Sequence, residues 1–153
     1  MKNIRTLLLT LTVAGSCSWI GFSNAAELLP AVPAGAQALS LQGKPLYAAS
    51  PNEDTRENFV AARASYELDP NTADTIIWYG RRTAYAGDYR RAIEIFSEGV
   101  NKFPEDPRFY RHRGHRYISI REFDRAISDF EQAAGLMQSL PLQVEPDGLP
   151  NAQ

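Results

Sequence analysis

The sequence has few of the side chains that covalent chemistry and metal binding require. Its 153 residues include one cysteine, Cys17, and two histidines, His112 and His115. One thiol can form neither an intrachain disulfide nor a thiolate metal site. A glycine-rich phosphate loop, a nucleophile elbow, a carboxylate pair and a Cys/His cluster are also absent from the sequence. We therefore expect no enzymatic activity and no cofactor.

Neither a strong net charge nor a long apolar run is present. The formal net charge of −2 gives no overall attraction to nucleic acid or membranes. The apolar stretch that begins at residue 7 is interrupted by Gly15 and falls short of the ~20 residues that span a bilayer. Lys2 and Arg5 precede it, and the small pair Ala25-Ala26 follows it. This pattern predicts a signal peptide over residues 1–25 and an exported protein, periplasmic or secreted.

Cys17 allows a second interpretation of the same segment. Residues 14–17 resemble a bacterial lipobox, in which Cys17 would become the lipidated first residue of a lipoprotein. Ala14 stands where that motif prefers leucine, and the residues after Cys17 are apolar. Cleavage after Ala25 would instead remove Cys17 and leave a mature chain without cysteine.

A repeat of 34 residues organises the rest of the chain. Residues 89–96, Tyr-Arg-Arg-Ala-Ile-Glu-Ile-Phe, return at 123–130 as Phe-Asp-Arg-Ala-Ile-Ser-Asp-Phe. The glycines at 80 and 114 keep the same offset. A fixed period of this size is typical of stacked helical hairpins.

Caps and breakers place the expected elements. Ser50 and Pro51 open a helix that ends before Asp69, and the Ala- and Pro-rich segment before it has no helical or alternating periodicity. Further helices are expected at 73–86, 89–102, 107–118 and 122–137. The resulting organisation is a linker at 26–50, a helical repeat domain at 51–138 and a Pro-rich irregular tail at 139–153.

Small residues recur where paired helices must approach closely. Gly80 is expected to face Ala92, and Gly114 to face Ala126. A glycine inside a helix costs about 1 kcal/mol relative to alanine, so two glycines at matching positions indicate close backbone contact.

These residues resemble the tetratricopeptide repeat (TPR) family. The resemblance covers residues 73–138 and, in part, 56–72, and it rests on Gly80, Gly87, Tyr89, Ala92, Phe96, Gly99, Pro104, Tyr110, Gly114, Tyr117, Phe123, Ala126, Phe130 and Ala133. It implies an all-α solenoid of two hairpins with a preceding half repeat, which binds a protein or peptide. Arg113 stands at a usual leucine, and we expect its head group to reach water. Arg121 replaces the turn glycine.

In TPR proteins the first helix of each hairpin lines the concave groove. The matching positions of this chain are therefore candidate ligand-binding residues. The resemblance implies a basic and aromatic groove suited to an acidic extended segment. The alternative interpretation is an arginine-rich face that only keeps the helices soluble. The groove residues are Asp74, Ile77, Trp78, Arg81, Tyr85, Arg108, Arg111, His112 and His115.

Several alternatives stay open at this point. His112 and His115 have the spacing of two metal ligands, although neighbouring arginines oppose a cation there. The last repeat has no polar capping helix in the sequence, so its apolar face could mediate self-association within a larger exported assembly. The chain also resembles the N-terminal part of longer exported bacterial TPR proteins of unknown role. Neither nucleic acid nor a small-molecule substrate is expected as a partner.

Overall fold

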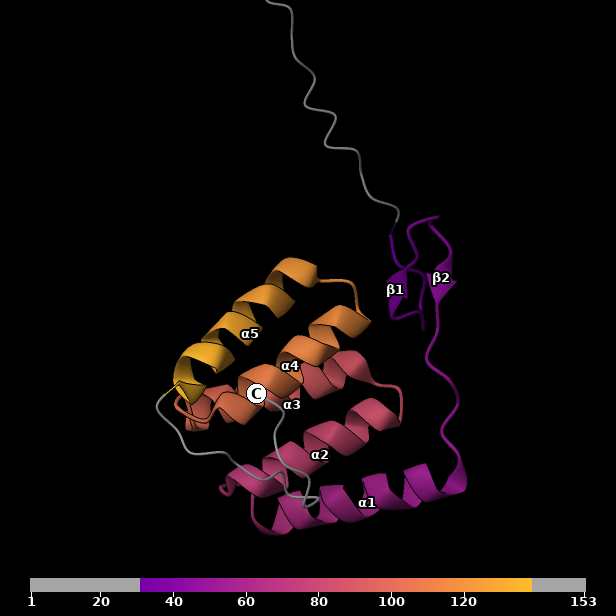
Figure 1. The fold of residues 1–153 in the computed structure, drawn as a ribbon. Coiled ribbons are helices and arrows are strands. Elements are labelled where there is room, and N and C mark those ends of the chain that lie inside the picture. The colour runs from indigo at the N-terminus through magenta and orange to yellow at the C-terminus, as the bar shows by residue number, and fades with distance from the viewer. Residues whose placement is uncertain (1–30, 139–153) are drawn as a thin grey trace, which may run out of the picture.

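The computed structural model describes residues 31–138 and shows five helices in sequence (Figure 1). They are α1 (Glu53–Leu68), α2 (Ala73–Tyr85), α3 (Tyr89–Lys102), α4 (Pro107–Ser119) and α5 (Phe123–Met137). The expected all-α hairpin architecture is confirmed. The predicted signal peptide, with Cys17, and the tail at 139–153 lie outside the described residues. Within 31–138 no helix has both the length and the apolar character needed to cross a membrane.

Short polar side chains fix the starts of the helices. The Asn52 side chain accepts a hydrogen bond of 2.9 Å from the Thr55 backbone N–H, so α1 begins one residue later, at Glu53. The prediction that Ser50 caps this helix is wrong, because Asn52 already satisfies the free backbone donor. Asp88 and Asp106 cap α3 and α4 in the same manner.

The α2–α3 and α4–α5 turns each place one residue at positive φ, although their sequences differ. Gly87, between α2 and α3, has φ of 94°, and Arg121, between α4 and α5, has φ of 66°. A side chain in this left-handed region costs about 1–2 kcal/mol. The repeat geometry therefore imposes on Arg121 a conformation that glycine would adopt without this cost.

Large apolar side chains from three helices fill the centre of the solenoid. Ile76 and Ile77 of α2, Phe96 of α3 and Phe109 of α4 are at most 1% exposed. A Cβ on Gly80 would lie 2.5 Å from Cε1 of Phe96. The nearest neighbours of Gly80 are therefore atoms of an aromatic ring, not Ala92 as we expected.

Gly114 has the matching environment one repeat later. A Cβ there would lie 2.9 Å from Cε1 of Phe130, so a ring again takes the place expected for Ala126. Ala92 and Ala126 are nevertheless 0% and 2% exposed, as close helix packing requires. The small residues thus allow close packing, but each glycine accommodates a ring of the following helix.

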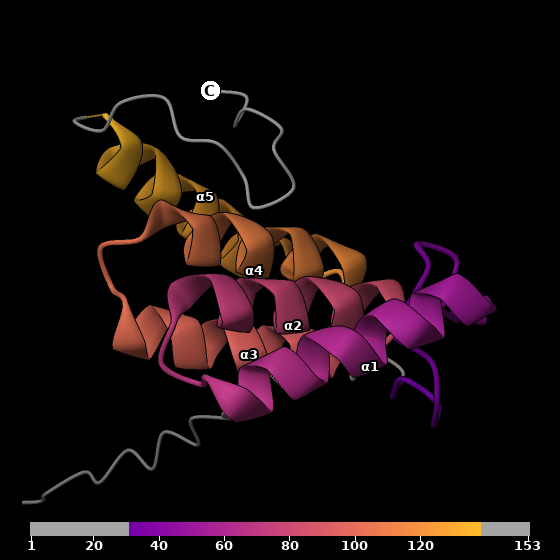
Figure 2. The ribbon, with the colours of Figure 1, turned by 90° about the horizontal axis from the view of Figure 1, so that it is seen from below.

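The helices stack in one direction. Figure 2 shows α1, α2 and α4 in a row, and α2 contacts α1, α3 and α4. Helix α1 buries no residue completely and rests on α2 through Phe59 and Tyr66, whose ring centroids lie 6.0 and 5.0 Å from that of Tyr79. It therefore has the position of the second helix of an incomplete preceding hairpin.

The segment predicted as a linker contains a short antiparallel hairpin. Strands β1 (Ala38–Leu39) and β2 (Pro45–Leu46) pair, and Ala38 is 2% exposed. Arg90 of α3 donates a hydrogen bond of 3.1 Å to the Gln37 carbonyl. Two-residue strands are too short to show an alternating pattern, so periodicity could not reveal them.

Arg113 points inward instead of toward water. Its Nε donates to Oδ2 of Asp129 at 2.8 Å, and its Nη2 donates to Oδ1 at 2.7 Å. Asp129 is 5% exposed, so this bidentate pair joins α4 to α5 beneath the surface. The expectation that Arg113 would extend its head group into water is wrong, because the Asp129 carboxylate on the next helix accepts two hydrogen bonds from the guanidinium and balances its charge.

Candidate functional site

One side of α2 carries an aromatic surface with a cation on top of it. The Arg81 guanidinium carbon lies 4.6 Å from the centroid of the Trp78 ring, and Arg81 Nη2 donates to the Tyr85 hydroxyl at 3.4 Å. Tyr85 is 50% exposed. A cation held against an aromatic face stays charged. The structure thus brings three of the predicted groove residues together.

A small cleft between α2 and α4 continues this surface. It has a volume of about 30 Å³, enough for about one water molecule. Arg81 and Tyr85 line it from α2, and His112 and Arg116 line it from α4. We call this cleft, together with half-buried Arg111 at its edge, the α2–α4 face.

The His112 ring forms the floor of the cleft. It stacks on Phe96 with centroids 5.5 Å apart and planes inclined by 20°. Burial, followed by the charges of Arg111 and Arg81, lowers the pKa of His112 to about 2. The imidazole is therefore neutral at physiological pH, and the positive charge of this face comes from its arginines.

His115 belongs to a different environment. Its ring meets Phe130 of α5 edge-on, with centroids 5.2 Å apart, and burial lowers its pKa. The two histidines therefore pack against different phenylalanines. Within 31–138 no group of three or more His, Cys, Asp or Glu side chains could hold a metal ion.

Three other predicted groove residues have different roles. Ile77 is 0% exposed and belongs to the central core, so its placement in the groove is wrong. Arg108 Nη1 donates to Asp74 at 2.8 Å, and its Nη2 donates to Asp106 at 2.6 Å. The Arg108–Asp74 ion pair joins the first helices of successive hairpins, α4 and α2, and helps to fix their relative position.

Sequence reasoning missed two arginines, Arg82 and Arg116. Burial lowers the pKa of Arg116, and its guanidinium carbon lies 5.6 Å from the centroid of the Tyr89 ring. Arg82 packs over Trp78 at 4.7 Å. The two residues are separated by the same 34 positions as the rest of the repeat, and this offset was the signal that could have identified both.

The described helices define a TPR-like helical-hairpin solenoid with a basic and aromatic face between its first helices. No protein-family model and no curated protein matches the chain. The support for the resemblance of the sequence to TPR proteins comes from the fold alone.

Solved structures with this fold include the following two. One is the type III secretion translocator chaperone SycD of Yersinia enterocolitica in an alternative dimer, with a TM-score of 0.54 and 23% identity over 57% of this chain and 67% of that chain. The other is MamA MSR-1 C2, with a TM-score of 0.51 and 17% identity. The alignment with MamA covers 54% of this chain and 48% of that chain. At these identities the likeness concerns the fold.

Proposed function

We propose that this protein is an exported interaction module that binds an acidic, extended segment of a partner protein on the α2–α4 face, and that it has no catalytic activity of its own. The observation that carries the proposal is the gathering of Arg81, Arg111 and Arg116 around neutral His112. The TPR-like fold supports protein binding in general, and a chaperone is among its structural neighbours.

Partial burial makes these arginines suited to a carboxylate. Burial lowers the pKa of Arg116, so its cation has lost part of its hydration in the free protein. A carboxylate that binds at the mouth of the cleft offers that charge a new partner and can accept two parallel hydrogen bonds from one guanidinium. Tyr85, half exposed beside the arginines, provides an aromatic edge for the main chain of a bound segment.

Charge reversal tests this assignment. The probe is a fluorescein-labelled peptide in which glutamate alternates with serine, compared with its lysine counterpart. An isolated exposed ion pair contributes only ~0–1 kcal/mol, so the test uses the Arg81→Glu/Arg111→Glu double variant. We expect a loss of at least about tenfold in affinity for the glutamate peptide, and weakening of parent binding at ~1 M salt, where the Debye length is about 3 Å.

The matched control is the Arg91→Glu/Arg125→Glu double variant. Its net charge equals that of the test variant, and both side chains are exposed, with Arg91 paired to Glu94 and Arg125 to Glu122. Equal losses in the two double variants would show that only overall charge matters and would remove the site from the α2–α4 face. Capture with the parent and the Arg81→Glu/Arg111→Glu variant from a periplasmic extract, followed by mass spectrometry, would then identify partners that depend on this face.

A second candidate function is self-association within a larger exported assembly. The observation that favours it is the exposure of apolar residues on α5, where Ile127 is 56% exposed and Ala134 is also exposed. Together with Phe130 and Met137 they form the face that a following hairpin would cover, either in a second copy or in a longer chain of which this is the N-terminal part. Sedimentation as a monomer at high concentration, for both the parent and Ile127→Glu, would count against it.

A further inference from the structure

Helix α1 corresponds to α3 at the same 34-residue offset as the rest of the repeat. Helix α1 ends at Leu68 and α3 ends at Lys102. The residue after each helix donates its backbone N–H to an equivalent carbonyl: Asp69 to Ser65 at 3.0 Å, and Phe103 to Gly99 at 2.7 Å. The junction of α1 with α2 is therefore comparable, position by position, with the junction of α3 with α4.

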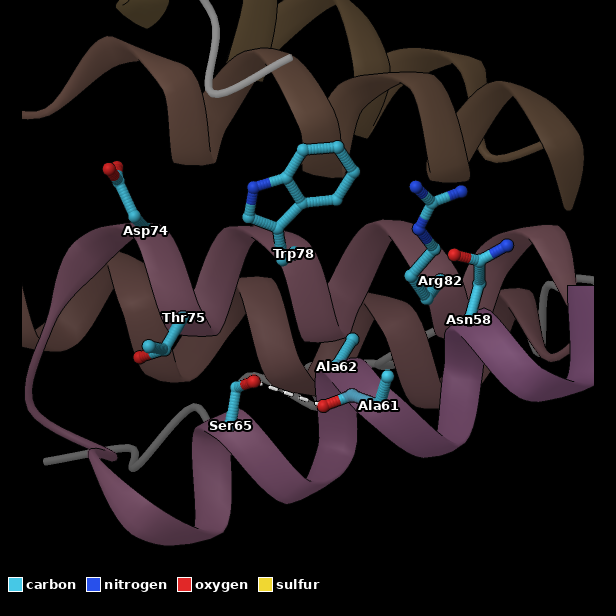
Figure 3. Close-up of a pocket in the computed structure, with 8 residues that line it drawn as sticks. All are labelled: Asn58, Ala61, Ala62, Ser65, Asp74, Thr75, Trp78 and Arg82. Atoms are coloured by element: carbon cyan, nitrogen blue, oxygen red, sulfur yellow. Dashed lines mark hydrogen bonds between the residues drawn. The ribbon is translucent and has the colours of Figure 1, made fainter.

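The two junctions differ in the size of their side chains. Phe96 and Phe109, which fill the α3–α4 junction, are 1% and 0% exposed. Their counterparts are Ala62 and Thr75, and the counterpart of His112 is the larger Trp78. The missing rings leave an open space of about 360 Å³ between α1 and α2. We call it the α1–α2 trough, and its lining is Asn58, Ala61, Ala62, Ser65, Asp74, Thr75, Trp78 and Arg82 (Figure 3).

The α3–α4 junction also shows what kind of element covers such a surface. Helix α2 packs on both α3 and α4, as the row of helices in Figure 2 shows. Within 31–138 no helix precedes α1. The segment before it forms the β1–β2 hairpin and then reaches Gly87, at the turn between α2 and α3, through Ala48 and Ala49. The α1–α2 trough thus has the geometry of a helix-binding junction to which none of residues 31–138 contributes a covering helix.

The charges around the trough select its occupant. Asp74 is paired with Arg108, whereas no carboxylate of the described residues pairs with Arg82, which packs over Trp78 and Tyr85. In Figure 3 the Trp78 ring and the Arg82 side chain project from α2 on the side away from α1, so they form the far wall of the trough. A bound helix therefore meets small apolar residues in the centre and a cation at one end.

We propose that the α1–α2 trough is a second interaction site, which binds an amphipathic helix of a partner protein with bulky apolar residues on one face and an acidic residue opposite Arg82. The apolar side chains occupy the space that Phe96 and Phe109 fill in the next junction. Helix-in-groove recognition uses such anchors at helical spacing. The trough adjoins the α2–α4 face through Trp78, on which Arg81 stacks, but none of the residues that line the trough lines the α2–α4 cleft. The proposal does not depend on the function proposed for that face.

The test uses the full chain and a stapled helix of about 14 residues, or four turns, with leucine on one face and glutamate on the other. Binding is followed by the ¹⁵N–¹H resonance of the Trp78 indole. Ala62→Phe places a ring where the next junction has one, so it should fill the trough and weaken binding by about tenfold or more. Ala64→Phe, an exposed position of α1 outside the trough, is the matched control and should leave the affinity within about twofold.

Arg82→Glu provides a test that does not change the volume of the trough. We expect it to reverse the preference between the glutamate helix and a matched lysine helix. Equal effects of Ala62→Phe and Ala64→Phe, an unmoved Trp78 resonance, or a shift caused by a second copy of the chain would overturn the proposal. Arg81→Glu/Arg111→Glu should abolish binding of the extended acidic peptide and leave the stapled helix bound, so failure of one site is distinguishable from failure of the other.

Discussion

The buried pair between Arg113 and Asp129 gives the sharpest prediction about stability. The Arg113 side chain is 17% exposed and that of Asp129 is 7% exposed. Arg113→Leu, which restores the family's usual leucine, leaves a buried carboxylate without its cation, and we expect a loss of about 3 kcal/mol in the free energy of unfolding. Asp129→Leu should cost less, about 1–2 kcal/mol, because the longer arginine can regain water.

The double variant distinguishes this pair from two independent residues. Replacing a buried ion pair by apolar side chains of similar volume is often neutral, so Arg113→Leu/Asp129→Leu should lie within about 1 kcal/mol of the parent. The coupling energy is then roughly 3–5 kcal/mol, at or above the upper end of the range for residues in contact. Urea unfolding followed by circular dichroism measures all four proteins, provided that the slope with urea is unchanged. Additive losses in the double variant would refute the interaction.

Four further predictions test separate features. The unfolded chain binds a proton at His112 below pH 6.5 whereas the folded chain, with a pKa of about 2, does not, so the stability present above pH 6.5 falls on acidification. The loss from His112 between pH 7 and pH 5 is about 2 kcal/mol, and His112→Gln should remove this part in urea unfolding at the two pH values, leaving the smaller contribution of His115, whose pKa burial also lowers. Gly99→Ala would place a Cβ 2.1 Å from a buried ring and should cost roughly 1–3 kcal/mol, whereas Gly135→Ala, with nothing within 4 Å, should not lower the melting temperature. Arg121→Gly should relieve the turn at φ of 66° and raise stability by up to about 1 kcal/mol. Intact-mass measurement of the exported protein should find a chain that starts at or near Ala26, and an unprocessed Met1 would contradict the signal peptide.

The helices could be predicted from sequence because their signals are local and repeated. The 34-residue offset, the cap at Asp106 and the breaker at Pro70 placed the helices from α2 onward close to their observed bounds. The start of α1 was harder to predict, because Ser50 and Asn52 can both cap a helix, and only backbone geometry decides between them.

Side-chain direction was harder to predict than helix position. Ile77 lies next to the groove residues on the helical projection, but its side chain enters the core formed with α3 and α4. Arg113 could be placed only with knowledge of Asp129, which is 16 residues away on another helix. The trough depends on a comparison of two junctions in space, since Ala62 and Thr75 are ordinary helix residues when only the sequence is considered.

The most direct test of the central claim is to map the acidic extended peptide onto the protein by NMR, through the side-chain Nε–Hε resonances of the arginines. Binding at the α2–α4 face should shift Arg81, Arg111 and Arg116 together and leave Arg91 and Arg125 unchanged. Shifts confined to Arg125 and its neighbours on α5, or no shift of the first three arginines at saturating peptide, would contradict the proposed site.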